Sequence, residues 1–206
     1  MEKVDFKQVF KAYYSPKPGQ PEIITLPKMQ FVMVDGKGDP NNSAQFQNAI
    51  GALYGIVYGL KFGRKKAGLQ PDYSIGPLQA LWWSDQGKDF ASIQKKDWSW
   101  TLMIWLPDFI NAKEVQEQVD LVKVKKPNPA LDGAHLESFN EGTVVQIMHI
   151  GPYDAEQPNI ELIHDFARQH GYQLDGKHHE IYLGDPRRAK PEKLRTIIRQ
   201  PIRRKS

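Results

Sequence analysis

The chain has 206 residues, 40% hydrophobic and 25% charged, a balance typical of a globular protein rather than a disordered one. It contains no cysteine, which excludes a disulfide scaffold, a cysteine-ligated zinc site and a cysteine nucleophile. The net charge of +4 comes from short scattered basic runs without a nucleic-acid-reading motif, so nucleic-acid binding is disfavoured. No apolar run approaches the roughly 20 residues that span a bilayer, and we expect a soluble, cytoplasmic protein without a membrane partner.

The first 28 residues are predicted to form an N-terminal arm ahead of a single domain over residues 29–206. Residues 5–14 have helical spacing, with Phe6, Val9, Phe10 and Tyr13 on one side, and the proline-rich segment 15–21 ends that helix. A strand is predicted over residues 30–34, where it runs into a glycine-rich turn.

A long helix is predicted next, capped at its start by Asn42 or Ser43. Its basic last turn and the following Gly68 are typical of a helix end. Tyr54 and Tyr58 are four residues apart and point the same way. The apolar spacing predicts one buried face, which consists of Phe46, Ile50, Leu53, Val57 and Leu60.

Two strands are predicted over residues 77–83 and 98–106, joined by a polar loop around residues 85–89. A helix over residues 111–123, capped by Asn111, and a linker over residues 125–129 follow. All five tryptophans lie between residues 82 and 105. This cluster predicts either an ordinary aromatic core or an aromatic-walled pocket for a flat or cationic ligand.

The second half repeats the pattern of the first. A strand is predicted over residues 144–150, a helix over 158–171, and two strands over 178–183 and 194–202. Strand, helix, strand, strand thus recurs about 115 residues further on, and we place the half-modules at about 29–126 and 140–206. The predicted fold is α+β, a pseudo-two-fold repeat with an antiparallel sheet, helices on one face and a central ligand cleft.

The strand over residues 178–183 carries the best candidate chemistry. Side chains alternate along a strand, so Glu180 and Tyr182 share one face and Ile181 lies on the other. A carboxylate in an aromatic cleft has a raised pKa through desolvation, which suits a proton acceptor, and it also suits a counter-ion for an organic cation. Tyr182 can donate a hydrogen bond to a carbonyl or an oxyanion.

Histidines give weaker signals than this carboxylate. His178 and His179 are adjacent on a strand and point apart, so we expect no metal site, and no motif predicts a cofactor. His149 lies near the end of a strand, where it is either a hydrogen-bonded structural residue or a residue that reaches a crevice.

Five segments together resemble the GyrI-like small-molecule-binding family, and the likeness runs over about residues 20–203. They are residues 31–41, 53–55, 100–104, 146–153 and 178–188. The resemblance implies two strand-helix-strand-strand (SHS2) modules around a cleft, in which the sensor members of the family meet cationic drugs with a buried glutamate.

Stand-alone members of the family that this chain resembles include cyclopropanoid hydrolases, which open a strained cyclopropane by adding water without a cofactor. The resemblance implies that Glu180 orients or deprotonates the water and that Tyr182 donates to the carbonyl of the substrate. It implies that the cleft is lined by Tyr54, Trp83, Trp100, His149 and Tyr153.

Two departures from the family pattern keep other functions open. Gln79 stands where we expect a glutamate, and Trp105 stands where we expect a polar residue. If the missing acid takes part in the chemistry, the protein binds its ligand without turnover. The alternatives are therefore a protein that sequesters or senses drugs and toxins, or one whose protein partner is DNA gyrase. The oligomeric state is not indicated.

Overall fold

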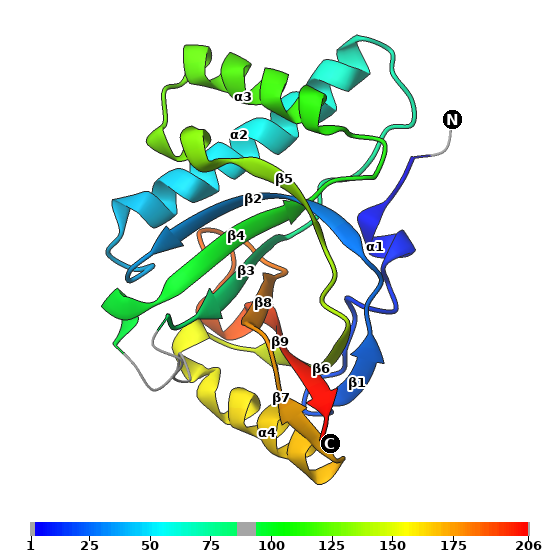
Figure 1. Ribbon diagram of the computed structural model, residues 1–206, viewed down its shortest axis with the longest axis vertical. Coiled ribbons are helices and arrows are strands. Elements are labelled where there is room, and N and C mark those ends of the chain that lie inside the picture. The colour runs from blue at the N-terminus through cyan, green and yellow to red at the C-terminus, as the bar shows by residue number, and fades with distance from the viewer. Residues whose placement is uncertain (1–2, 86–93, 206) are drawn as a thin grey trace. The chain divides into compact units, whose positions relative to one another are not determined.

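A computed structural model describes residues 3–85 and 94–205 (Figure 1). The polar loop predicted around residues 85–89 lies outside the described residues from position 86 onward. The chain divides into two compact units, each formed from several stretches of sequence. Unit 1 holds the N-terminal residues up to Val9, Met29–Gly76 and Trp82–Phe139, and unit 2 holds Phe10–Lys28, Pro77–Leu81 and the residues from Asn140 onward.

In unit 1, strand β2 pairs antiparallel with β4 on one side and with β5 on the other. Asp35 of β2 pairs with Thr101 of β4, and Phe31 of β2 pairs with Glu137 of β5. Helix α2 packs on β2 and β4, and α3 packs on α2 and β5. The elements of this unit are α1 (Phe6–Val9), β2 (Met29–Lys37), α2 (Ala44–Lys66), β4 (Ser99–Trp105), α3 (Ala112–Lys125) and β5 (His135–Phe139).

Helix α2 begins and ends where its sequence predicts. The side chain of Ser43 accepts a hydrogen bond from the backbone N–H of Phe46, which satisfies one of the free donors of the first turn. Three basic residues occupy the last turn, where they complement the helix dipole. The predicted buried face is correct except at Ile50, which is only partly buried, whereas the neighbouring Ala49 and Ala52 are buried.

The strands of unit 2 pair antiparallel as part of one sheet, in the order β1, β6, β9, β8, with β7 also paired to β9. Helix α4 covers one face of this sheet, where Ile160, Ile163 and Ala167 pack on Ile147 and Ile198. The elements are β1 (Glu22–Thr25), β6 (Thr143–Ile150), α4 (Gln157–Gln169), β7 (Tyr172–Leu174), β8 (His178–Tyr182) and β9 (Arg195–Arg204). Strand β3 (Leu78–Trp83) begins in unit 2 and ends in unit 1.

The predicted α+β class and the repeated order of elements are confirmed. Strand, helix, strand, strand occurs as β2, α2, β3, β4 and again as β6, α4, β8, β9, with the short β7 added. In both repeats the first strand pairs antiparallel with the last. In residues 3–85 and 94–205, no helix is long and apolar enough to cross a membrane.

The N-terminal helix is shorter than predicted. It covers only Phe6–Val9, and Val9 is 55% exposed rather than buried. Turns follow in its place, closed by the hydrogen bond from the backbone N–H of Tyr13 to the carbonyl of Phe10. Phe6 anchors the short helix by packing on Trp105, with 5.3 Å between ring centroids. The departure from the family pattern at Trp105 therefore has a structural role in unit 1.

Candidate functional site

Strand β8 has two different faces, as the alternation of its side chains predicts. Glu180 pairs with Ile198 of β9, and Ile198 belongs to the apolar core beneath α4. Residues that pair across antiparallel strands point to the same face, so Glu180 lies on the face that α4 covers. Its strand neighbours His178 and Tyr182 share this face, whereas His179 and the fully buried Ile181 lie on the other.

Glu180 is held by two side chains of its own strand. The hydroxyl of Tyr182 donates to Oε2 of Glu180 over 2.7 Å. Nε2 of His178 lies 3.4 Å from Oε1 of Glu180, and the His178 side chain is only 1% exposed. The Glu180 side chain itself is 13% exposed. The carboxylate is therefore largely desolvated and fixed in orientation, which suits a group that must present one oxygen to a ligand.

A second carboxyl group, Glu156, belongs to the same cluster. It lies in the turn just before α4, is 4% exposed and forms a side-chain hydrogen bond with Glu180. Burial, followed by the negative charge of Glu180, raises the pKa of Glu156 to about 9. At neutral pH Glu156 is therefore a neutral acid that can donate a hydrogen bond to the Glu180 carboxylate.

Tyr153 completes the aromatic side of this cluster. It lies in the turn Tyr153–Ala155, and its ring meets the Tyr182 ring edge-on, with 5.5 Å between centroids and 70° between planes. Burial and the nearby charges of Glu156 and Glu180 raise the pKa of Tyr153 to about 12. The phenol therefore keeps its proton at neutral pH and can act as a hydrogen-bond donor.

His149 lies on the same face of the sheet but is engaged in structural contacts. The register aligns His149 of β6, Thr196 of β9 and Tyr182 of β8 in one row. Nδ1 of His149 lies 2.9 Å from the amide nitrogen of Asn159, and Nε2 lies 3.1 Å from the carbonyl oxygen of Pro152. These contacts fit a neutral imidazole that accepts at Nδ1 and donates from Nε2, tying the turn to α4.

Three predicted site residues belong to unit 1. Tyr54, on α2, is partly buried and stacks on Tyr58, with 6.0 Å between ring centroids. Nε1 of Trp83 donates to Asp85 over 2.9 Å. Trp100 is fully buried, with its ring edge-on to Phe46 at 5.0 Å, and is part of the core of that unit. Unit 2 thus brings together four of the predicted site residues, which are Glu180, Tyr182, Tyr153 and His149. That the three residues of unit 1 line a ligand site stays a prediction.

The opposite face of β8 carries a buried polar network, which the sequence did not predict. Nδ1 of His179 lies 2.8 Å from Oε1 of Glu141, and Nε2 lies 3.0 Å from Oε1 of Gln79. Arg199, paired with His179 in the sheet, donates from Nε to Gln146 over 2.6 Å and stacks on the ring of Tyr14, 4.5 Å from its centroid. This network ties the segment before β1 to the sheet of unit 2.

The position of Gln79 shows whether the glutamate expected there would belong to the Glu180 cluster. Gln79 is fully buried and contacts His179 and Tyr14, which lie on the face opposite Glu180. A glutamate at position 79 would therefore lie in the buried network and not beside Glu180. The substitution removes no group from the Glu180 cluster.

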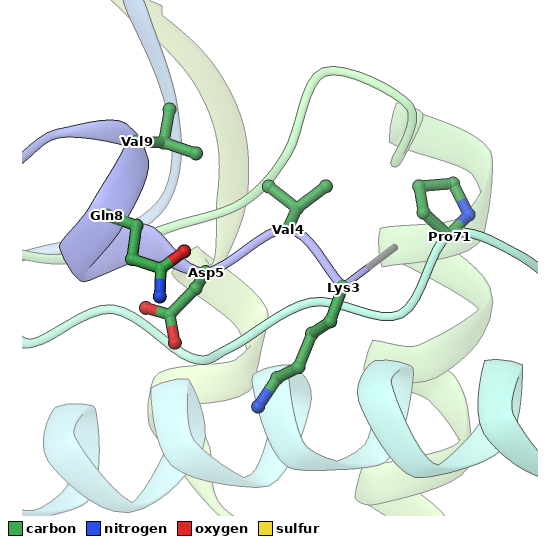
Figure 2. A pocket seen from close by; sticks show the side chains of 6 residues that line it. All are labelled: Lys3, Val4, Asp5, Gln8, Val9 and Pro71. Carbon is green, nitrogen blue, oxygen red and sulfur yellow. The ribbon is translucent and has the colours of Figure 1, made fainter. Parts of the chain in front are cut away.

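A cavity of about 320 Å³ lies in unit 1, and its lining includes none of the predicted site residues (Figure 2). The N-terminal segment and Pro71 form its walls, and Asp5 uses its carboxylate to accept the backbone N–H of Lys7 over 2.9 Å. The side chains that line it do not converge on a reactive group. Within residues 3–85 and 94–205, no three acidic or histidine side chains are grouped so that they could hold a metal ion.

Comparison with known proteins identifies the class to which this fold and site belong. The profile of the GyrI-like small molecule binding domain matches residues 19–203, so the chain belongs to the GyrI-like family of small-molecule-binding proteins. Among curated protein sequences, no significant match is found.

Solved structures agree with this assignment. An uncharacterized conserved protein from Listeria innocua is 37% identical, with a TM-score of 0.89 over 97% of this chain and 100% of that one. A structure described as a hydrolase from Listeria innocua is also 37% identical, with a TM-score of 0.86 over 98% of this chain and 100% of that one. The C-terminal domain of EcmrR shares the fold at 13% identity, with a TM-score of 0.57 over 90% of this chain and 98% of that one.

Proposed function

We propose that the protein binds planar, aromatic or electrophilic small molecules next to Glu180 and hydrolyses those that carry a strained cyclopropane. The observation that carries the proposal is the Glu180 carboxylate, desolvated and held at 2.7 Å by the Tyr182 hydroxyl, with the ring of Tyr153 beside Tyr182. The Listeria relative described as a hydrolase supports a catalytic role. Family membership supports the small-molecule ligand.

The unit 1 residues take different parts in this proposal. Tyr54 and Trp83 are partly exposed, and we assign them to the walls of the ligand site. Trp100 is fully buried, so we assign it a supporting place behind such a wall. We also assign His149 a supporting place, in unit 2, because its contact with the carbonyl of Pro152 holds the turn that carries Tyr153.

The proposed reaction adds one water molecule to the substrate. Glu180 takes a proton from water while the water oxygen bonds to the methylene carbon of the cyclopropane. The ring carbon–carbon bond breaks, and its electron pair moves through the conjugated system to the carbonyl oxygen, which takes the Tyr182 proton. The hydrogen bond between Tyr182 and Glu180 then returns the proton from the carboxyl to the phenolate. The enzyme is regenerated, and the product is the substrate plus water.

A binding role without turnover is the second candidate. A carboxylate beside the rings of Tyr153 and Tyr182 also fits an organic cation, because ring faces and a negative charge both attract positive charge. Such a protein would sequester a drug or toxin and leave it chemically unchanged.

Mass spectrometry of a cyclopropane-bearing dienone before and after incubation separates the two candidates. We expect the wild-type protein to convert the compound into its water adduct. Glu180→Gln should lower the rate by about 10²- to 10⁴-fold, the usual contribution of a general base. Glu161→Gln, on the exposed side of α4, is the matched control and should react as the wild type does. Quenching of tryptophan fluorescence without a product indicates sequestration, and unchanged turnover by Glu180→Gln refutes the assigned role.

A further inference from the structure

We propose that Glu156 is a second carboxyl group of the ligand site, that Glu156 and Glu180 share one proton when the site is empty, and that a cationic ligand expels this proton on binding. The inference rests on the proposed function, since it needs a ligand next to Glu180. It goes beyond that function because it assigns a second residue to the site and couples ligand binding to proton release.

Two independent elements bring the two carboxyl groups together, where the ring of Tyr153 in the turn lies 5.5 Å from the ring of Tyr182 on β8. Glu180 is fixed by the register of β8 on β9, and Glu156 is fixed by the turn that enters α4, where its backbone N–H bonds to the carbonyl of Tyr153. Oε1 of Glu156 is buried, and among the described residues it has no hydrogen-bond partner. An ionised Glu156 would therefore leave a buried charge poorly compensated, whereas the neutral acid is tolerated.

The charged and titratable groups around the pair come from three segments. They are Glu180, Tyr182 and His178 on β8, Tyr153 in the turn of Glu156, and Asp185 after β8, which acts on Tyr153 and is paired with Arg187 at 2.9 Å. The surroundings of Glu156 favour its protonated form, because burial and then the charge of Glu180 raise its pKa by more than the hydroxyl of Thr196 lowers it. Two adjacent carboxyl groups resist double ionisation, so the pair carries one negative charge at neutral pH.

A bound cation changes this balance. A positive charge next to the pair attracts both carboxylates and offsets their mutual repulsion, so the second proton leaves more easily. Ligand binding and proton release are then linked, and the affinity for a monocation should rise by up to about tenfold per pH unit below the pKa of Glu156. A neutral planar ligand has no such effect on the carboxyl groups, and its affinity should not follow this dependence.

Calorimetric titration with ethidium, a planar monocation, tests the inference. At pH 7.5, in phosphate and in Tris, the difference in binding enthalpy between the two buffers gives the number of protons released. We expect close to one proton per ethidium for the wild type and for Glu161→Gln, and none for Glu156→Gln. Phenanthridine, which has a similar ring system but is neutral at this pH, should release none from the wild type.

The outcomes distinguish this inference from the proposed function. Ethidium binding without proton release overturns the shared proton and leaves the assignment of the ligand site intact. Failure of ethidium to bind also overturns the inference, while the cyclopropane assay decides the proposed function separately. If Glu156→Gln does not fold, carbon-13 NMR of labelled glutamate carboxyls in the wild type gives the same answer. One neutral carboxyl resonance at pH 7.5 should disappear on addition of ethidium, and its persistence in the complex contradicts the proposal.

Discussion

Replacement of Glu156 by glutamine should make the stability of unit 2 less sensitive to an increase in pH. In the folded protein the pKa of Glu156 is raised to about 9, by burial and then by the charge of Glu180, whereas an exposed glutamate in the unfolded chain titrates near 4.5. Between these two values the folded state binds one proton more than the unfolded state. The contribution of this group to the free energy of unfolding is therefore largest below about pH 4.5. It is lost as the pH rises toward 9.

The magnitude follows from the number of protons. One proton bound only in the folded state changes the free energy of unfolding by about 1.4 kcal/mol per pH unit. Between pH 5 and pH 8 the wild type should therefore lose up to about 4 kcal/mol through this group. Glutamine has the same shape and cannot ionise, so Glu156→Gln should lack this loss. The variant should approach the wild type at low pH and exceed it in stability at pH 8.

Urea unfolding at several pH values between 5 and 8 measures the effect. Far-ultraviolet circular dichroism is the better probe, because all five tryptophans lie between residues 82 and 105, in unit 1, and Glu156 lies in unit 2. Only the difference between variant and wild type is interpreted, so that other titrating groups cancel. Glu161→Gln should show the wild-type dependence. Parallel curves for the wild type and Glu156→Gln would refute the reasoning.

Two further predictions concern stability. Glu141→Gln leaves the buried Arg199 without its carboxylate and should cost about 3–5 kcal/mol in urea unfolding at pH 7. Burial alone would raise the pKa of Glu141, but the ring of His179, which hydrogen-bonds to it, and the guanidinium of Arg199 outweigh burial and lower this pKa, so the loss should shrink as the pH falls below about 4.5. Gly36→Ala should lower the free energy of unfolding by about 1–3 kcal/mol, because its Cβ would overlap the buried ring of Trp100. Gly63→Ala, where a Cβ meets no atom, should raise it by about 0.5–1 kcal/mol, and an equal effect of both changes would contradict the packing argument.

The long elements of the fold could be predicted because several local signals agree in them. Helix α3, for example, begins with a capping box in which Asn111 and Glu114 each accept a backbone N–H of the other. The short strands β1, β5 and β7 could not be predicted, because three to five residues carry too little periodicity. Among the described residues, β1 and β5 each pair with one strand only, as edge strands do.

The candidate site could be predicted only as far as one strand determines it. The alternation of side chains places Glu180 and Tyr182 on one face, and their hydrogen bond follows from this spacing. The contact between Glu180 and Glu156 depends instead on the pairing of β8 with β9 and on the packing of α4 over that face. A local sequence pattern does not encode such a contact. The local signal is an acidic residue at the N-cap of a helix, two positions before Pro158 in its first turn.

The two faces of β8 carry different sets of polar groups, and this difference answers the question raised by Gln79. A carboxylate at position 79 would join Glu141 and Arg199 in the buried network, where it would add a charge to a structural cluster. The acid that can exchange a proton with Glu180 is supplied instead by Glu156, from the turn before α4.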